Sequence, residues 1–250
     1  MKKIILLLAS LSLLSMALAD TANVAPAPLK IGIIGDSTVS NYKESLRTRG
    51  WGQLLPEFLQ PGVVVINEAK PGRSTKTFAS DLWQRVLTSK PDFILIQFGH
   101  NDSHDKGKPE STDAATDYRE NLRRFVREAR EAGAVPVLVT PVRRRIFGKD
   151  GKLSTELAPY VEAMKAVAAE LTVPVIDLHA TSGALYERLG EQGSDAFTLN
   201  QADNADRPGK GDRTHFTEAG AREIARLVAT DLARVDPRLA AAVRFDPAAR

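Results

Sequence analysis

Residues 29–38 have the sequence LKIGIIGDST, a hydrophobic run that ends in a small, polar turn. The run itself, Leu29–Gly35, is nearly continuously apolar and rich in isoleucine, which is typical of a strand covered on both faces. Four later runs share this character, namely Val63–Asn67, Asp92–Gly99, Val135–Thr140 and Val173–Asp177. The sequence therefore predicts five buried strands.

Helical patterns lie between and after these strands, as three stripes of apolar residues at helical spacing. The first stripe follows an expected N-cap at Asp117 and the third an expected N-cap at Thr217, because both residue types cap helices well. The members are Tyr118, Leu122, Phe125, Val126 and Ala129 in the first stripe, Tyr160, Met164, Val167, Ala168 and Leu171 in the second, and Ile224, Leu227, Val228 and Leu232 in the third. This alternation predicts one α/β domain, a parallel sheet with helices on both faces.

The first 19 residues have a different character from the rest. A basic start, Met1-Lys2-Lys3, leads into an apolar run that ends at Leu18, and small residues flank that end. The pattern predicts a cleaved signal peptide at 1–19; the alternative, an uncleaved anchor, is disfavoured because a membrane-spanning helix needs about 20 apolar residues. Residues 20–28 are expected to form a loose leader and residues 29–250 the domain. We therefore expect a secreted or periplasmic protein that leaves the membrane after signal cleavage.

Composition and charge exclude several classes of function. The 250 residues are 43% hydrophobic and 26% charged, which is ordinary for a globular protein. The absence of cysteine excludes disulfides, thiolate metal sites and a cysteine nucleophile. Without Lys2 and Lys3 the formal net charge falls from +3 to +1, so nucleic-acid binding is not expected. The four histidines lack the spacing of a metal site.

Polar residues follow the predicted strands at the sheet edge where parallel sheets carry their chemistry. Ser37 comes after the first strand and Asn101 after the third, while Asp212 and His215 precede the C-terminal helix. Each has a structural explanation alone, as a turn or cap residue. Together, a serine, an aspartate and a histidine can form a triad in which the histidine deprotonates the hydroxyl. Val39 stands where the lipase elbow needs a glycine, so the α/β-hydrolase fold is not expected.

This set of residues resembles the GDSL or SGNH hydrolases, which are named for a serine, a glycine, an asparagine and a histidine on four sequence blocks. The matching residues here are Ser37, Gly72, Asn101 and His215. Within the family the chain is similar to the rhamnogalacturonan acetylesterase branch. The supporting stretches are Gly35 to Val39, Gly50-Trp51-Gly52-Gln53, Gly72 to Thr75, Gln97 to Asp102, Thr140 to Arg145, and Asp212 to Phe216.

The resemblance implies a flavodoxin-like, three-layer α/β/α fold with a five-stranded parallel sheet, and neither a metal nor a cofactor. It implies that Ser37 is the nucleophile, His215 the general base and acid, and Asp212 the residue that orients His215. The backbone N–H groups of Ser37 and Gly72 and the side-chain amide of Asn101 would form the oxyanion hole.

The resemblance further implies removal of acetyl groups from pectic rhamnogalacturonan, an acidic polysaccharide. Arg73, Arg143 and Arg144 are then candidate substrate contacts, because guanidinium groups pair well with carboxylates. A solvated arginine loop is the alternative explanation for the run Arg143-Arg144-Arg145. His100, beside Asn101, is a further candidate contact.

Three other residues are expected to have structural roles. His104 is expected on a surface loop, His179 at the start of a helix, and Trp51 in the core. Other acetylated glycans, xylan among them, and short-chain lipid esters are alternative substrates, and a non-catalytic carbohydrate-binding protein is the alternative from another class. A monomer is the default expectation for a domain of this size.

Overall fold

The structure, a computed structural model, describes residues 28–199 and 211–244. The predicted signal peptide and all of the leader except Pro28 therefore lie outside the described residues. The five predicted strands are confirmed and all are parallel. They are β1 (Lys30–Gly35), β2 (Val64–Asn67), β3 (Phe93–Gln97), β4 (Val135–Val139) and β5 (Val175–Ile176). Their order, β2-β1-β3-β4-β5, is that of a flavodoxin-like sheet.

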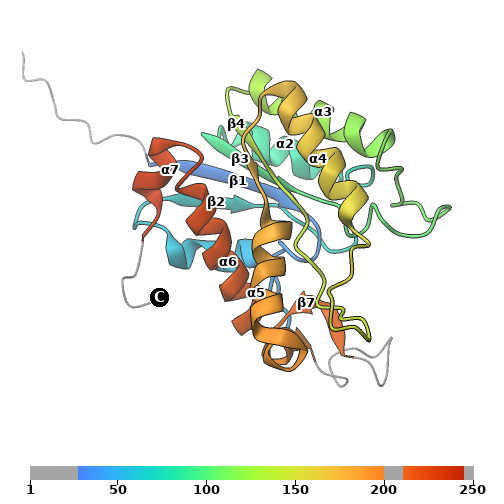
Figure 1. Cartoon of the computed structure of the whole chain (residues 1–250). Coiled ribbons are helices and arrows are strands. Elements are labelled where there is room, and N and C mark those ends of the chain that lie inside the picture. Colours follow the sequence, from blue (N-terminus) through green and yellow to red (C-terminus); the bar gives the residue numbers. More distant parts are fainter. Residues whose placement is uncertain (1–27, 200–210, 245–250) are drawn as a thin grey trace, which may run out of the picture.

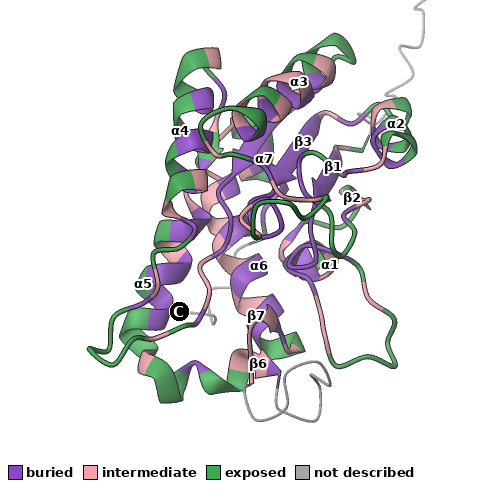
Figure 2. Cartoon of the chain, turned by 90° about the vertical axis from the view of Figure 1, so that its right-hand side faces the viewer, coloured by how far each residue is buried: buried purple, intermediate pink, exposed green. Residues whose placement is uncertain are grey.

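Helices cover both faces of this sheet, so the fold has three layers (Figure 1). One face carries α1 (Trp51–Leu54), η1 (Leu55–Phe58), α5 (Leu178–Gly193), α6 (Glu218–Leu232) and α7 (Pro237–Ala242), and the other carries α2 (Ser80–Thr88), α3 (Asp117–Glu131) and α4 (Ala158–Leu171). Strand side chains alternate between the two layers, since Ile33 packs into the first core and Ile34 into the second. Figure 2 shows β1 and β3 buried along their length.

The edge strand β2 is less covered than the sequence predicts. Val64 is 39% exposed and the other three residues of β2 are half-buried. The interior strand β1, by contrast, has Gly32 where α2 packs closely. A Cβ atom there would lie 2.7 Å from Val86 Cγ1, so a larger residue would push α2 away from the sheet.

The three predicted apolar stripes lie on α3, α4 and α6, and one of the two expected caps is found. The Thr217 hydroxyl accepts a hydrogen bond from Gly220 N at 3.3 Å and so caps α6. The expected cap at Asp117 is wrong, because Thr116 occupies the N-cap position and Asp117 is the first helical residue. A carboxylate there still favours the helix through its dipole. No helix in the described parts of the chain is both long and apolar enough to cross a membrane.

The segment with Asp212 and His215, which precedes the C-terminal helix, is a strand. β7 (Asp212–Phe216) pairs antiparallel with β6 (Thr198–Leu199). Arg49 N donates a hydrogen bond to the carbonyl of Phe216 at 3.0 Å from the other side. The strand is therefore supported on both edges, and it lies at the end of the sheet that carries the β1 turn.

Candidate active site

A tight turn after β1 presents Ser37. The Asp36 carboxylate accepts hydrogen bonds from the backbone N–H of Thr38 at 2.8 Å and from its hydroxyl at 2.7 Å. Gln97 donates to the Thr38 hydroxyl and in turn accepts from the Trp51 indole, both at 2.8 Å. Trp51 is fully buried, which confirms its predicted place in the core. The backbone beside Ser37 is thus fixed by the Asp36 side chain of the same turn and by side chains from two other segments.

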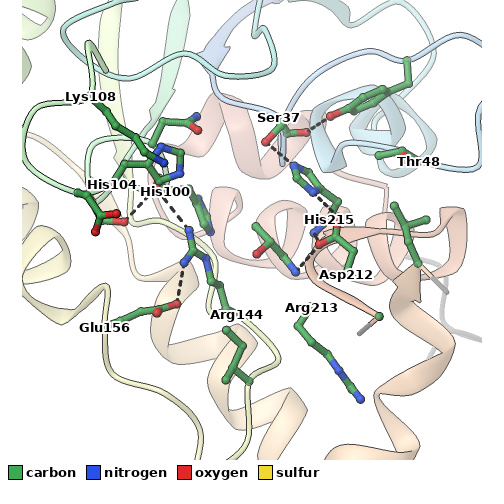
Figure 3. A pocket seen from close by; sticks show the side chains of 18 residues that line it. Ser37, Thr48, His100, His104, Lys108, Arg144, Glu156, Asp212, Arg213 and His215 are labelled. Carbon is green, nitrogen blue, oxygen red and sulfur yellow. Dashed lines mark hydrogen bonds and ion pairs between the residues drawn. The ribbon is translucent and has the colours of Figure 1, made fainter. Parts of the chain in front are cut away.

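Ser37, His215 and Asp212 form one continuous chain of hydrogen-bonding groups (Figure 3). His215 Nε2 lies 2.8 Å from Ser37 Oγ, and His215 Nδ1 lies 2.6 Å from Asp212 Oδ2. The other carboxylate oxygen of Asp212 accepts the backbone N–H groups of Thr214 and His215, each at 2.9 Å. This geometry can move a proton from the serine hydroxyl to the imidazole.

The charge state of Asp212 suits that chemistry. Burial alone raises the pKa of the Asp212 carboxyl. The hydrogen bond and charge of His215, with the backbone N–H groups of His215 and Thr214, outweigh burial and leave this pKa well below its usual range. An ionised Asp212 holds the proton on His215 Nδ1, so Nε2 is free to accept the proton of Ser37.

Of the predicted oxyanion-hole residues, Ser37 and Asn101 line one pocket. One N–H of the Asn101 side-chain amide donates to the carbonyl of Arg73 at 2.8 Å. This bond fixes the amide and connects it to the turn that holds Gly72, whose φ of +74° favours glycine. Gly72 itself is exposed and is not among the residues that line the pocket. The second N–H of Asn101 is the donor that the fixed geometry leaves for a ligand.

The pocket in front of Ser37 has a volume of about 930 Å³, which is at the large end for ligand sites. Its wall carries cationic and acidic side chains opposite the serine (Figure 3). The charged members outside the Ser37–His215–Asp212 chain are Asp105, Lys108, Arg144, Glu156 and Arg213. Within the described residues, no group of three or more histidine, aspartate or glutamate side chains has the arrangement of a metal site.

His100 lines the pocket, but both of its ring nitrogens are engaged inside the protein. Nδ1 lies 3.2 Å from the carboxylate of Asp36 and Nε2 lies 3.0 Å from the carbonyl of Val142. Both partners are hydrogen-bond acceptors inside the protein, so neither ring nitrogen is left to contact a ligand. Burial raises the pKa of Asp36, but the charge and hydrogen bond of His100 outweigh burial and lower it. The expected substrate contact by His100 is therefore corrected to a structural role in the pocket wall.

The three arginines predicted to contact substrate differ in whether they line the pocket. Arg144 lines the pocket and pairs with Glu156 at 2.9 Å. Arg73 and Arg143 are not among the lining residues, and Arg143 donates to the carbonyl of Ser154 at 3.2 Å. Arg145 is fully buried, so the run is not the solvated loop of the alternative explanation. Substrate contact through Arg73 and Arg143 is thus not supported by their positions.

Sequence reasoning missed other residues of the pocket. His104 lies on a partly exposed loop, as predicted, but this loop also forms part of the pocket wall, and His104 Nδ1 is 2.6 Å from the Glu110 carboxylate. Lys108 lines the pocket from the same segment, and the Tyr42 hydroxyl donates to the carbonyl of Ser37 at 2.9 Å. The available signal was a histidine, a lysine and a glutamate close together directly after Asn101. His179 is the second residue of α5, as predicted.

Comparisons with known proteins agree with this arrangement. Residues 33–223 match the GDSL-like lipase/acylhydrolase family. The chain is 42% identical over 211 residues to the rhamnogalacturonan acetylesterase RhgT of Bacillus subtilis (strain 168), covering 81% of this chain and 88% of RhgT. It is 39% identical over 203 residues to the probable rhamnogalacturonan acetylesterase YesY of the same strain, covering 80% and 90%. The crystal structure of Bacillus subtilis YxiM superposes with a TM-score of 0.70 at 28% identity, over 83% of this chain and 56% of YxiM. The chain therefore belongs to the GDSL-like lipase/acylhydrolase family and is a carboxylic ester hydrolase.

Proposed function

We propose that this enzyme removes O-acetyl groups from pectic rhamnogalacturonan with Ser37, His215 and Asp212 as its catalytic triad. The observation that carries the proposal is the unbroken chain from Ser37 Oγ through His215 to Asp212, at 2.8 and 2.6 Å, which opens onto a pocket of sugar-binding size. The relatives RhgT and YesY, named for activity on rhamnogalacturonan, support the choice of substrate.

The reaction proceeds in two balanced steps. Ser37 Oγ attacks the acetyl carbonyl and its proton passes to His215 Nε2; the bond to the sugar oxygen then breaks, and the sugar hydroxyl leaves with that proton. A water molecule next attacks acetyl-Ser37, gives its proton to His215 and releases acetic acid as Ser37 recovers its proton. Asp212 stays ionised and stabilises the imidazolium that forms in each step.

The negative charge on the carbonyl oxygen needs fixed donors. The N–H groups of Ser37 and Gly72 and the free amide N–H of Asn101 supply them in this proposal. Each such donor contributes about 3 kcal/mol to transition-state stabilisation in other hydrolases. The bond from Asn101 to Arg73 keeps the amide from rotating toward solvent, so little reorganisation is needed during the reaction.

In this proposal, the cations of the pocket wall bind the carboxylates of the acidic substrate. Arg144 and Arg213 line the pocket but already pair with Glu156 and Asp195, at 2.9 and 2.6 Å. Lys108 has no ion-pair partner among the described carboxylates, so it is the cation most available to a galacturonate carboxylate. Lys108→Ala is expected to raise KM on the pectic polymer several-fold and to leave KM on a neutral aryl acetate unchanged.

Acetate release separates the candidate substrates. Wild-type enzyme is incubated with acetylated rhamnogalacturonan and acetylated xylan in parallel, with Ser37→Ala as the control. We expect release mainly from the pectic polymer and none with Ser37→Ala. Release mainly from xylan would overturn the substrate proposal and leave the triad intact. A Ser37→Ala variant with full activity would overturn the triad, and a wild-type protein that only binds the polymer would favour the carbohydrate-binding alternative.

We further propose that the protein is exported, on the strength of the basic start and apolar run in residues 1–19. The expected result is a secreted or periplasmic protein whose N-terminus is Asp20. Amino-terminal sequencing of protein from the periplasm and from the medium tests this directly. An intact Met1 on protein recovered from the cytoplasm would contradict it.

A further inference from the structure

Arg145 is an unusual residue in this fold, because it is a fully buried arginine. None of the described carboxylates lies within ion-pair distance of it, whereas its neighbour Arg144 pairs with Glu156 at 2.9 Å. A buried charge without an opposite charge is costly, so proteins keep one only where other polar groups hold it. The partners of Arg145 therefore indicate its role.

Those partners belong to the strand that carries the catalytic pair. Arg145 Nη2 donates to the carbonyl of His215 at 2.5 Å and lies 3.4 Å from the carbonyl of Asp212. Arg145 Nε donates to the Thr198 hydroxyl on the neighbouring strand β6 at 3.2 Å. The backbone N–H of Arg145 donates to the carbonyl of Arg213 at 3.0 Å. One residue thus binds three of the four residues from Asp212 to His215 through their backbone.

Aromatic rings hold the guanidinium in place. Its central carbon lies 4.8 Å from the centre of the Phe216 ring and 5.8 Å from that of Tyr186. The charged and titratable groups that act on it are Tyr186, Asp212 and Arg213. Arg145 is therefore buried against the catalytic strand, outside the lining of the pocket, as a positive charge with a rigid set of donors.

We propose that Arg145 is a positioning residue that fixes the Asp212–His215 pair against Ser37, a role that rests on the proposed triad. Because the guanidinium donates hydrogen bonds to the carbonyls of both Asp212 and His215, the strand has little freedom to rotate or slide. The distance from His215 Nε2 to Ser37 Oγ, 2.8 Å, depends on that placement. Displacements of about 1 Å in such sites reduce rates by about 100-fold.

Two substitutions separate the donors from the charge. Arg145→Lys keeps the positive charge but loses the planar set of guanidinium N–H donors. Arg145→Met loses both the charge and the donors. With 4-nitrophenyl acetate as substrate, we expect kcat to fall about 10- to 100-fold in both variants, with KM unchanged within about twofold. Labelling of Ser37 by a fluorophosphonate is expected to slow by a similar factor, because it needs the same activated serine.

The dependence of kcat/KM on pH distinguishes this role from a merely structural one, because loss of a residue that only stabilises the fold would not shift the profile. Loss of the positive charge favours protonation of the neighbouring Asp212–His215 pair. The acidic limb of the kcat/KM profile is therefore expected at higher pH in Arg145→Met and unshifted in Arg145→Lys. An identical limb in wild type and Arg145→Met would overturn the electrostatic part of the proposal.

Controls keep the result interpretable. Arg130→Met removes an arginine that also donates to backbone carbonyls, of Leu171 at 2.8 Å and of Thr172, far from the pocket. Val86→Ala lowers stability on the other face of the sheet. Both are expected to keep wild-type kcat below their melting temperatures. If Arg145→Met does not fold, Thr198→Val removes one acceptor of Arg145 and is expected to lower kcat a few-fold.

The proposal is overturned if folded Arg145→Lys and Thr198→Val both keep wild-type kcat and wild-type fluorophosphonate labelling. That result is distinct from a failure of the proposed function. If the triad is wrong, Ser37→Ala retains its esterase activity on the aryl acetate; if only the role of Arg145 is wrong, Ser37→Ala is inactive while the Arg145 variants are fully active.

Discussion

Two histidine–aspartate pairs lie beside Ser37, and they differ in what the second nitrogen of each histidine faces. In the Asp212–His215 pair, Nε2 lies 2.8 Å from the serine hydroxyl. In the Asp36–His100 pair, Nε2 lies 3.0 Å from the carbonyl of Val142. The His215 side chain is 33% exposed and that of His100 only 3%.

The difference decides which pair can take part in proton transfer. A hydroxyl can give its proton to the histidine that faces it, whereas a backbone carbonyl has no proton to give and only accepts a hydrogen bond. His215 Nε2 can therefore take the proton of Ser37, whereas both ring nitrogens of His100 face acceptors inside the protein. A histidine–carboxylate pair thus becomes a candidate base only when its second nitrogen faces a proton donor and open space.

The largest effect is expected from removing the histidine that faces Ser37. His215→Ala leaves the serine without a base, so kcat should fall by about 10⁴-fold or more. Ester hydrolysis of an aryl acetate measures this effect, and circular dichroism confirms the fold. A loss of less than tenfold would show that the two pairs do not differ in the way proposed.

Asp212→Asn tests the carboxylate of the same pair. The amide no longer holds the proton on His215 Nδ1, and we expect kcat to fall by about 10³- to 10⁴-fold, with little change in melting temperature. Asp36→Asn is the matched change in the other pair. It is expected to reduce stability more than rate, so equal losses of kcat in the two variants would remove the distinction.

His100→Gln tests whether the Asp36–His100 pair stabilises the fold rather than taking part in catalysis. The buried Asp36 carboxylate loses its only cationic partner among the described residues, and such losses destabilise proteins by about 3–5 kcal/mol. The melting temperature should fall by several degrees while kcat stays within about tenfold. Because His100 holds the pKa of Asp36 below its usual range, the wild type should lose stability as the pH falls through that range. Thermal melts of both proteins between about pH 3 and 7 check this, and a pH-independent difference would contradict it.

Much of this arrangement could be predicted from the sequence. The five strands follow from continuous β-branched runs such as Leu29–Gly35, and the helices α3, α4 and α6 from their apolar stripes. The residues of the Ser37–His215–Asp212 chain could be predicted because Ser37 follows the first strand, Asp212 and His215 precede the C-terminal helix, and together they belong to a recognisable set. Parallel strands bring such positions to one edge of the sheet.

Other features depend on contacts that no sequence pattern records. The role of His100 is decided by Asp36, 64 residues away, and by a backbone carbonyl. The strand β6 has only two residues, Thr198 and Leu199, too few to produce a periodic signal. Arg145 cannot be told from Arg143 and Arg144 in the sequence, and its burial goes with the hydrogen bond from its backbone N–H to the carbonyl of Arg213 in β7. The roles of His100 and Arg145 thus depend on atoms of residues far away in the sequence.

A third aspartate, the buried Asp102, extends the comparison because no histidine side chain is among its hydrogen-bond partners. Its carboxylate accepts hydrogen bonds from the hydroxyls of Thr75 and Thr112, at 2.5 and 3.0 Å. Burial raises the pKa of Asp102 to about 7, although the hydrogen bonds from both threonines oppose this shift. The carboxyls of Asp36 and Asp212, each with a histidine partner, thus have a lowered pKa, whereas burial without a histidine partner raises the pKa of Asp102.

Asp102→Asn is expected to have the smallest effect and a distinctive dependence on pH. The folded protein keeps a proton on Asp102 between about pH 4 and 7 that the unfolded chain releases, so wild-type stability falls as the pH rises through this window, by up to about 1.4 kcal/mol per pH unit. Asparagine mimics the protonated carboxyl and does not titrate. The melting temperature of Asp102→Asn relative to wild type should therefore rise from pH 5 to pH 8, whereas exposed Asp105→Asn should show no such trend. If the difference between Asp102→Asn and wild type is constant across this range, Asp102 is ionised without a histidine, and a facing histidine is not what separates the three aspartates.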